Sequence, residues 1–213
     1  MANVMILDTE TTNSLDDPFC YDIGWAIIND KNGEIIKTRS FAVAEIFLNK
    51  PLMEIAYFAE KIPSYNEEIK QGKRELRRLY NIRKALRQDC EEYEIKEIYA
   101  HNARFDYFSC NHTQRYLTCS KYRYFFPYGI KICDTLQMSR EVLGKNRKYR
   151  RFCKKNNYLT QRGENRYTAE IIYRFLTKNN DFIEEHKGID DVLIEKDIFF
   201  YCHKRHAKNR ALW

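Results

Sequence analysis

The sequence predicts one mixed α/β domain, in which a five-stranded sheet is flanked by helices. The chain has 213 residues, of which 44% are hydrophobic and 15% aromatic, enough to bury a core. Its 7 glycines and 4 prolines are too few for a sheet-only fold built on tight turns. Apolar runs near the start give way to alternating helical and strand patterns, an order typical of a sheet with helices on its faces. We therefore expect residues 1–213 to form a single domain.

The expected strands are short apolar runs bounded by turn residues. The first, VMILD, is continuous and ends in an acidic residue. The next two flank the run DKNG, which has the composition of a hairpin turn. Two further runs, IKEIYA and IKICD, lie between helical patterns. The strands are expected over 4–8, 21–29, 33–43, 95–100 and 130–134.

The expected helices have apolar residues at helical spacing. Pro51 and Pro63 punctuate the early helical stretches, and Thr168 is suited to cap a later helix. The charged stretch 45–94 carries no motif that we can assign, so we expect a helical elaboration within the domain. The helices are expected over 45–60, 65–92, 101 to about 121, 135–142, 168–178 and about 188–208.

Features that would direct the chain to a membrane or to secretion are not evident in the sequence. No window approaches the roughly 18 consecutive apolar residues of a membrane span. Asp8 and Glu10 interrupt the region where a signal peptide would need apolar residues. The 7 cysteines form neither a Cys-x-x-Cys nor a finger-like spacing, so a disulfide framework and a structural zinc site are not indicated. We expect a cytoplasmic protein that does not associate with membranes.

The basic residues are concentrated in two blocks. The net charge is +7, but Arg140–Arg166 alone holds ten basic and two acidic residues, a surplus of eight. Lys73–Arg87 has seven basic residues against one acidic residue, and we interpret it as a solvated helical face. Alternating cations and aromatic rings are typical of a surface that follows phosphates and stacks on bases. The aromatic residues within the first block are Tyr149, Phe152, Tyr158 and Tyr167. The first block therefore predicts a nucleic-acid partner.

Acidic residues follow two of the apolar runs and begin the last helix. Asp8 and Glu10 are two residues apart on a strand, so they project to the same side, where hard oxygen ligands can share or bridge divalent cations. Asp106 follows the strand expected over 95–100. His186 precedes Asp191 by five positions at the start of the last helix. Each feature alone is also routine at strand ends or helix starts, so the inference depends on their order.

In this order the motifs resemble those of the DEDDh exonucleases, a 3′–5′ exonuclease family that includes proofreading domains and RNase T-like enzymes. ILDTETT resembles the first motif, AHNARFD the second and HKGIDD the third, and the resemblance extends from about residue 4 to residue 200. It implies an RNase H-like α/β fold, with a mixed five-stranded sheet flanked by helices. It also implies a metal-dependent 3′–5′ exonuclease that hydrolyses phosphodiester bonds of DNA or RNA and releases nucleoside monophosphates.

The resemblance assigns a role to each acidic position. It implies that Asp8, Glu10, Asp106 and Asp191 are metal ligands and that His186 is the general base. Two Mg²⁺ or Mn²⁺ ions would offset the mutual repulsion of four crowded carboxylates. The residues expected to contact the substrate, in the second and first motifs and in the basic block, are Asn102, Phe105, Thr9, Thr11, Arg150, Arg151, Lys154 and Lys155.

Other readings of the same motifs remain open. A catalytically inactive nucleic-acid-binding module on the same scaffold is disfavoured by five intact polar positions. An RNase H or integrase-like endonuclease is disfavoured by the compact Asp-x-Glu and the late His-x-x-x-x-Asp. The sequence does not separate DNA from RNA, or a general exonuclease from one that trims short oligonucleotides, because basic clusters attract any polyanion. We expect a single-stranded 3′ end as substrate and consider a polymerase or replication protein as a further partner.

Overall fold

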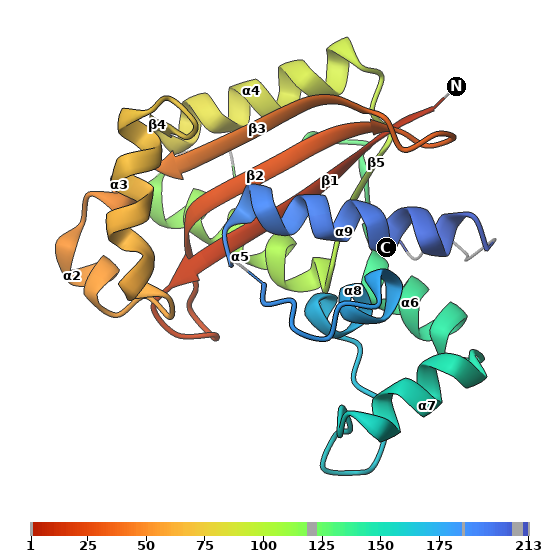
Figure 1. Cartoon of the computed structure of the whole chain (residues 1–213). Coiled ribbons are helices and arrows are strands. Elements are labelled where there is room, and N and C mark those ends of the chain that lie inside the picture. The colour runs from red at the N-terminus through yellow and green to blue at the C-terminus, as the bar shows by residue number, and fades with distance from the viewer. Residues whose placement is uncertain (1, 119–122, 185, 206–210, 213) are drawn as a thin grey trace.

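The computed structural model describes residues 2–118, 123–184, 186–205 and 211–212, and these form a mixed sheet with helices on both faces (Figure 1). Within these ranges the sheet has six strands, in the order β4-β3-β2-β1-β5-β6. The strands are β1 (Asn3–Thr12), β2 (Phe19–Asn29), β3 (Ile35–Val43), β4 (Glu75–Arg77), β5 (Glu97–Ala100) and β6 (Lys131–Asp134). The helices are α1 (Ala44–Phe47), α2 (Lys50–Glu54), the 3-10 helix η1 (Ala59–Lys61), α3 (Ile62–Lys70), α4 (Leu79–Glu92), α5 (Ala103–Leu117), α6 (Thr135–Gly144), α7 (Arg147–Lys155), α8 (Ala169–Thr177) and α9 (Gly188–His203).

The strand directions confirm the predicted mixed sheet. β1, β2 and β3 are consecutive antiparallel strands, whereas β5 runs parallel to β1 and β6 parallel to β5. The carboxyl ends of β1, β5 and β6 therefore lie at the same edge of the sheet. The expected count of five strands is wrong, because the short strand β4 pairs in parallel with β3 and adds a sixth.

Alternation along β1 divides the interior into two cores. Met5 and Leu7 belong to the core on the side of α4 and α5, whereas Val4 and Ile6 belong to the core beneath α9. Figure 1 shows α9 crossing one face of β1 and β2. Because side chains alternate along a strand, Asp8 and Glu10 lie on the α9 side of the sheet. This is the common face that the sequence predicted for them.

The elaboration 45–94 is more broken than the two expected helices. Pro51 and Pro63 lie in the first turns of α2 and α3, where a missing N–H is tolerated. Gly72 follows the end of α3 and has a φ of 72°, a left-handed conformation that glycine adopts readily and that does not continue a helix. The expected helix over 65–92 is therefore wrong as one element, and it is replaced by part of α3, β4 and α4.

The later elements follow the sequence prediction more closely. The side chain of Thr168 accepts a hydrogen bond from the backbone N–H of Ile171, which confirms the predicted cap of α8. The expected ends of the helices at about 121 and 208 fall on or beside residues outside the described ranges. None of the helices within the described part of the chain combines the length and apolar character of a membrane span.

Candidate active site

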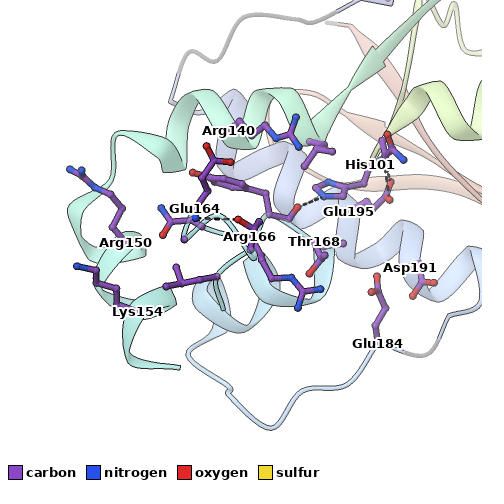
Figure 2. A pocket seen from close by; sticks show the side chains of 18 of the residues that line it. His101, Arg140, Arg150, Lys154, Glu164, Arg166, Thr168, Glu184, Asp191 and Glu195 are labelled. Carbon is purple, nitrogen blue, oxygen red and sulfur yellow. Dashed lines mark hydrogen bonds between the residues drawn. The ribbon is translucent and has the colours of Figure 1, made fainter. Parts of the chain in front are cut away.

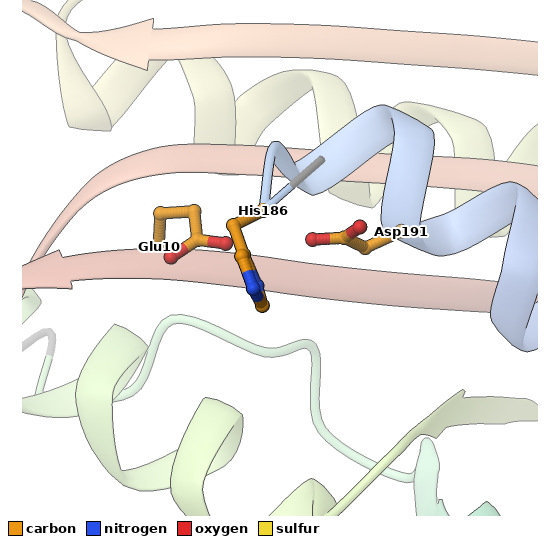
Figure 3. Close-up of side chains that lie close together, drawn as sticks. All are labelled: Glu10, His186 and Asp191. Carbon is orange, nitrogen blue, oxygen red and sulfur yellow. The ribbon is translucent and has the colours of Figure 1, made fainter. Parts of the chain in front are cut away.

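The centre of the site lies where α9 begins above β1. Glu10, His186 and Asp191 each bring one ligand atom within 4.8 Å of the other two. Figure 3 shows the imidazole of His186 between the two carboxylates. In the sheet, Glu10 is paired with Asp22 of β2, and Asp8 is paired with Gly24. The packing of α9 on the sheet thus brings together residues that are far apart in the sequence, one on the first strand and two around the start of the last helix.

Two buried carboxylate oxygens at this centre lack protein partners. Oδ2 of Asp8 and Oδ1 of Asp191 are buried, and neither has a hydrogen-bond partner among the described residues. An unpaired buried acceptor is costly unless another group compensates it. Hard anionic oxygens are the ligands that Mg²⁺ and Mn²⁺ prefer. The residues present therefore fit a divalent-cation site.

The electrostatics of the centre agree with this fit. Burial, followed by repulsion from Asp191, Asp22 and Glu184, raises the pKa of Glu10 to about 9. Burial and repulsion from Glu184 raise the pKa of Asp191 to about 8. Burial also raises the pKa of Asp8, with added repulsion from neighbouring carboxylates. The raised pKa values of these carboxyl groups mean that the cluster favours protonation or a bound cation, and a cation would displace the protons.

Asp106 lies beside this centre rather than among its closest groups. It is in the first turn of α5, and its Oδ1 accepts a hydrogen bond of 2.9 Å from the hydroxyl of Thr9. Burial raises the pKa of Asp106 to about 7, and its charge in turn contributes to the raised pKa of Asp8. Thr9 projects to the side of the sheet opposite Glu10, so in this structure it contacts Asp106 and does not line the pocket.

Glu195 is a member of the cluster that the sequence reasoning missed. It is buried in α9, one turn after Asp191, and both of its carboxylate oxygens accept the backbone N–H of His101 at 3.1 Å. Among charged neighbours, Glu195 makes the largest contribution to the raised pKa of Asp8. The i,i+4 spacing from Asp191 was the available signal, because it places both side chains on one face of a helix.

The acidic centre forms one end of a groove of about 1520 Å³. The other end is bounded by α6, α7 and the segment 159–168 (Figure 2). Of the predicted substrate contacts, Asn102, Arg150, Arg151 and Lys154 line the groove. Thr11, Phe105 and Lys155 are not among its lining residues. The sequence reasoning did not single out three further basic residues that line it, namely Arg140, Arg147 and Arg166.

Of the four aromatic residues of the basic block, Tyr149, Phe152 and Tyr158 pack against other rings, and Tyr167 lines the groove. Tyr149 is fully buried, and its hydroxyl donates a hydrogen bond of 2.6 Å to the backbone carbonyl of Arg166. Phe152 packs against Tyr158 and Phe175. These rings form a small core that fixes α7 and the following segment, leaving the cations on the outer side. The predicted stacking surface is therefore wrong for Tyr149 and Phe152, whose rings serve helix packing, and stays a prediction for Tyr167.

Comparisons with known proteins agree with the architecture. No family model matches the chain, and no curated protein sequence matches it. A full-length 3′-exonuclease has a similar structure, with a TM-score of 0.66 and 13% identity over 98% of this chain and 84% of that one. The nuclease domain of 3′hExo, described as a DEDDh family member bound to rAMP, gives a TM-score of 0.56 and 12% identity over 99% and 96%. Pop2p of S. pombe, in a form with Mg²⁺ and Mn²⁺ bound, gives a TM-score of 0.56 and 14% identity over 95% and 83%.

These likenesses define the class of fold. The chain has the RNase H-like α/β fold of the DEDDh-type 3′-exonucleases, as the sequence motifs predicted. At 12–14% identity these three structures share the fold of this chain.

Proposed function

We propose that this protein is a metal-dependent 3′–5′ exonuclease that hydrolyses phosphodiester bonds of DNA or RNA and releases nucleoside monophosphates. The observation that supports it best is that the acidic centre and a row of basic side chains line the same groove. We call this row the basic wall; it consists of Arg140, Arg147, Arg150, Arg151, Lys154 and Arg166. Carboxylates alone would repel a polyanion, whereas cations at the carboxylates and arginines along the groove would attract it. The substrate strand would follow the basic wall and place its 3′ end at the acidic centre.

In this proposal two divalent cations, Mg²⁺ or Mn²⁺, are held by Asp8, Glu10, Asp106 and Asp191. The unpaired oxygens of Asp8 and Asp191 support these two ligands most directly. When bound, the cations supply electrostatic stabilisation to the attacking and leaving oxygens. The ions named for the Pop2p neighbour are the same two metals. Thr9 has a supporting role, because its hydroxyl orients the carboxylate of Asp106.

His186 is proposed to accept the proton of the attacking water. Its imidazole lies beside Glu10 and Asp191, where such a water would be polarised, and histidine is the commonest general base in enzymes. The water oxygen would bond to phosphorus as the bond to the 3′ oxygen breaks, and the terminal nucleotide would leave with its 5′ phosphate. Asn102, Arg150, Arg151 and Lys154 would hold the strand from the wall of the groove.

Three of the predicted substrate contacts do not line the groove. Thr11, Phe105 and Lys155 would meet substrate only if it extended beyond the lining of the groove. The structural neighbours give no support to a polymerase partner, so the proposed partner is nucleic acid alone. DNA and RNA both remain within the proposal, because the basic wall recognises phosphate and not sugar.

A cleavage time course tests the proposal. A 5′-labelled single-stranded oligonucleotide, as DNA and as RNA, would be incubated with Mg²⁺, Mn²⁺ or EDTA. We expect a ladder that shortens from the 3′ end, that EDTA abolishes, and that His186→Ala slows by about 10²–10⁴-fold. His112→Ala is the matched control, because His112 lies on α5, away from the groove lining, beside Asp17. Tight binding without cleavage would instead identify a binding module, and internal cuts would identify an endonuclease.

A further inference from the structure

The elaboration 45–94 contacts the segment that carries His186. This segment, residues 186–188, leads into α9, of which Gly188 is the first residue, and each of its three positions is held by a side chain from another part of the chain. His186 has a φ of 50°, in the left-handed region that few residues other than glycine adopt. The contacts that hold this segment come from Phe58 and Glu68, both between β3 and α4, and from Asp22 on β2.

The first contact is an aromatic stack. The ring of Phe58, just before η1, lies parallel to the imidazole of His186, with ring centroids 4.2 Å apart and an interplanar angle of 11°. A ring nitrogen of His186 lies within 4.8 Å of a carboxylate oxygen of Glu10 and of Asp191, and Figure 3 shows these three side chains together. Phe58 therefore limits the rotation of the imidazole without occupying the position between the carboxylates.

The second contact is an ion pair. Nζ of Lys187 lies 2.6 Å from Oε1 of Glu68 on α3. The other carboxylate oxygen of Glu68 accepts a hydrogen bond of 3.0 Å from Nε of Arg74. Arg74 is only 1% exposed, and its guanidinium lies over the ring of Tyr65 at 4.2 Å. A surface ion pair would be weak, but this one is anchored to a buried arginine, which restricts its geometry.

The third contact joins the same network to the sheet. Oδ2 of Asp22 accepts hydrogen bonds from the backbone N–H of Gly188, at 2.9 Å, and from the hydroxyl of Tyr65, at 2.6 Å. Arg74 pairs with the other oxygen of Asp22. Because Asp22 is the partner of Glu10 in the β1–β2 ladder, the network ties the segment to the strand that carries the acidic centre.

We propose that Phe58 and Glu68 are positioning residues, which hold His186 in place beside Glu10 and Asp191. This inference rests on the proposed function, in which His186 accepts a proton. A general base must lie within hydrogen-bond reach of its proton, and misplacement by about 1 Å can cost up to about 100-fold in rate. The elaboration 45–94 thereby acquires a role that its sequence did not reveal: it supports the catalytic histidine.

The test of the stack uses Phe58→Leu, with Phe58→Trp as the variant that restores an aromatic face. Phe108→Leu is the matched control, because Phe108 stacks on His112, with centroids 5.5 Å apart, away from the groove. The imidazole resonances of the 5 histidines would be recorded by NMR, and His186→Ala would identify the resonance of His186. Steady-state cleavage would give kcat and KM for each variant, and a thermal melt would show that each variant folds.

We expect Phe58→Leu to move the His186 resonances, because the shielding by the stacked ring is lost, and to lower kcat about tenfold with KM within about twofold. Phe58→Trp should restore most of kcat, and Phe108→Leu should move only the resonances of His112. Unchanged His186 resonances in a folded Phe58→Leu protein would overturn the proposal. So would moved resonances with an unchanged kcat. If the wild type cleaves no substrate, the proposed function is wrong, and the resonances still decide whether Phe58 holds His186.

The ion pair is tested separately by Glu68→Gln. Its matched control is Glu67→Gln, because Glu67 is exposed on the same helix and faces Lys70. We expect Glu68→Gln to lower kcat several-fold and to move the His186 resonances, and Glu67→Gln to do neither. Equal effects of the two variants would show that the charge of α3, and not the contact with Lys187, is responsible, and would overturn this part of the proposal.

Discussion

Gly24 and Gly188 allow α9 to begin directly against the sheet. A Cβ atom added at Gly24 would lie 2.6 Å from the backbone N of Ile189 and 2.7 Å from the carbonyl carbon of Gly188. Ordinary contacts begin at 3.4 Å, so in Gly24→Ala the start of α9 would have to move by about 0.8 Å. Backbone atoms cannot rotate away as a side chain can, so the whole helix end must shift.

This displacement has a cost that can be measured. Overpacking of this kind destabilises a protein by about 1–3 kcal/mol. For a chain of this size each kcal/mol lowers the melting temperature by about 2–4 °C, so we expect Gly24→Ala to melt about 2–12 °C lower. His186 and Asp191 flank the displaced backbone, so kcat should fall by about 10–100-fold.

Thermal melts followed by circular dichroism check the prediction, with Gly144→Ala as control. A Cβ at Gly144 would meet only the hydroxyl of Tyr167, at 3.5 Å, and alanine is favoured over glycine in a helix by about 0.5–1 kcal/mol. That control should therefore melt at or slightly above the temperature of the wild type. A Gly24→Ala protein that melts together with the wild type would refute the close packing of α9 on β2.

Two further predictions concern charge. In EDTA, the free energy of unfolding should fall as the pH rises from about 7 to about 8.5, because the folded chain retains protons on Glu10 and Asp191 that the unfolded chain has released. Saturating Mn²⁺ should raise the melting temperature, most strongly at the upper end of this range, because the cation replaces those protons. Reversing the charges of Arg150, Arg151 and Lys154 should weaken binding of single-stranded DNA and RNA alike, and reduce the slope of log K against log salt by about 2.

Each of these predictions has its own control. Asp191→Asn should flatten the pH dependence in EDTA, and a stability that rises with pH in the metal-free wild type would contradict the raised pKa values. For the basic wall, the control is charge reversal of Lys31, Lys96 and Lys131. Lys96 directly precedes β5 and Lys131 is the first residue of β6, so both lie at the end of the sheet opposite the site. If both triple variants lose affinity equally, net charge and not the groove determines binding.

The parts of the fold that the sequence predicts well depend on local patterns. The period of two along β1 places Asp8 and Glu10 on one face, and Thr168 caps α8 as its residue type suggests. Strand β4 has only three residues and forms because β3 is beside it, so no local pattern identifies it. The interruption at Gly72 was visible in the sequence, but one glycine in a charged stretch does not by itself specify a new strand.

In the candidate site, too, some residues are predicted from the sequence, whereas others are recognised only in the folded chain. The resemblance of the motifs to those of the DEDDh exonucleases predicts Glu10, His186 and Asp191, which the fold brings together. The buried network of Asp22 and Arg74 depends on residues 52 positions apart, and only the folded chain shows that they meet. The aromatic residues of the basic block illustrate the opposite problem: the same spacing suits an exposed stacking surface and the buried side of a helix.

The order of the acidic centre along the chain has a consequence during synthesis. Asp8 and Glu10 are in the first strand, whereas His186, Asp191 and Glu195 belong to the last segment and the last helix. Translation proceeds from the amino terminus, so a nascent chain exposes the first carboxylates long before their partners leave the ribosome. A chain that has been translated only as far as residue 185 therefore carries Asp8, Glu10 and Asp106 but lacks His186, Asp191 and Glu195. If the proposed function is correct, the site is complete only after residues 186–195 have been translated and α9 has packed on the sheet.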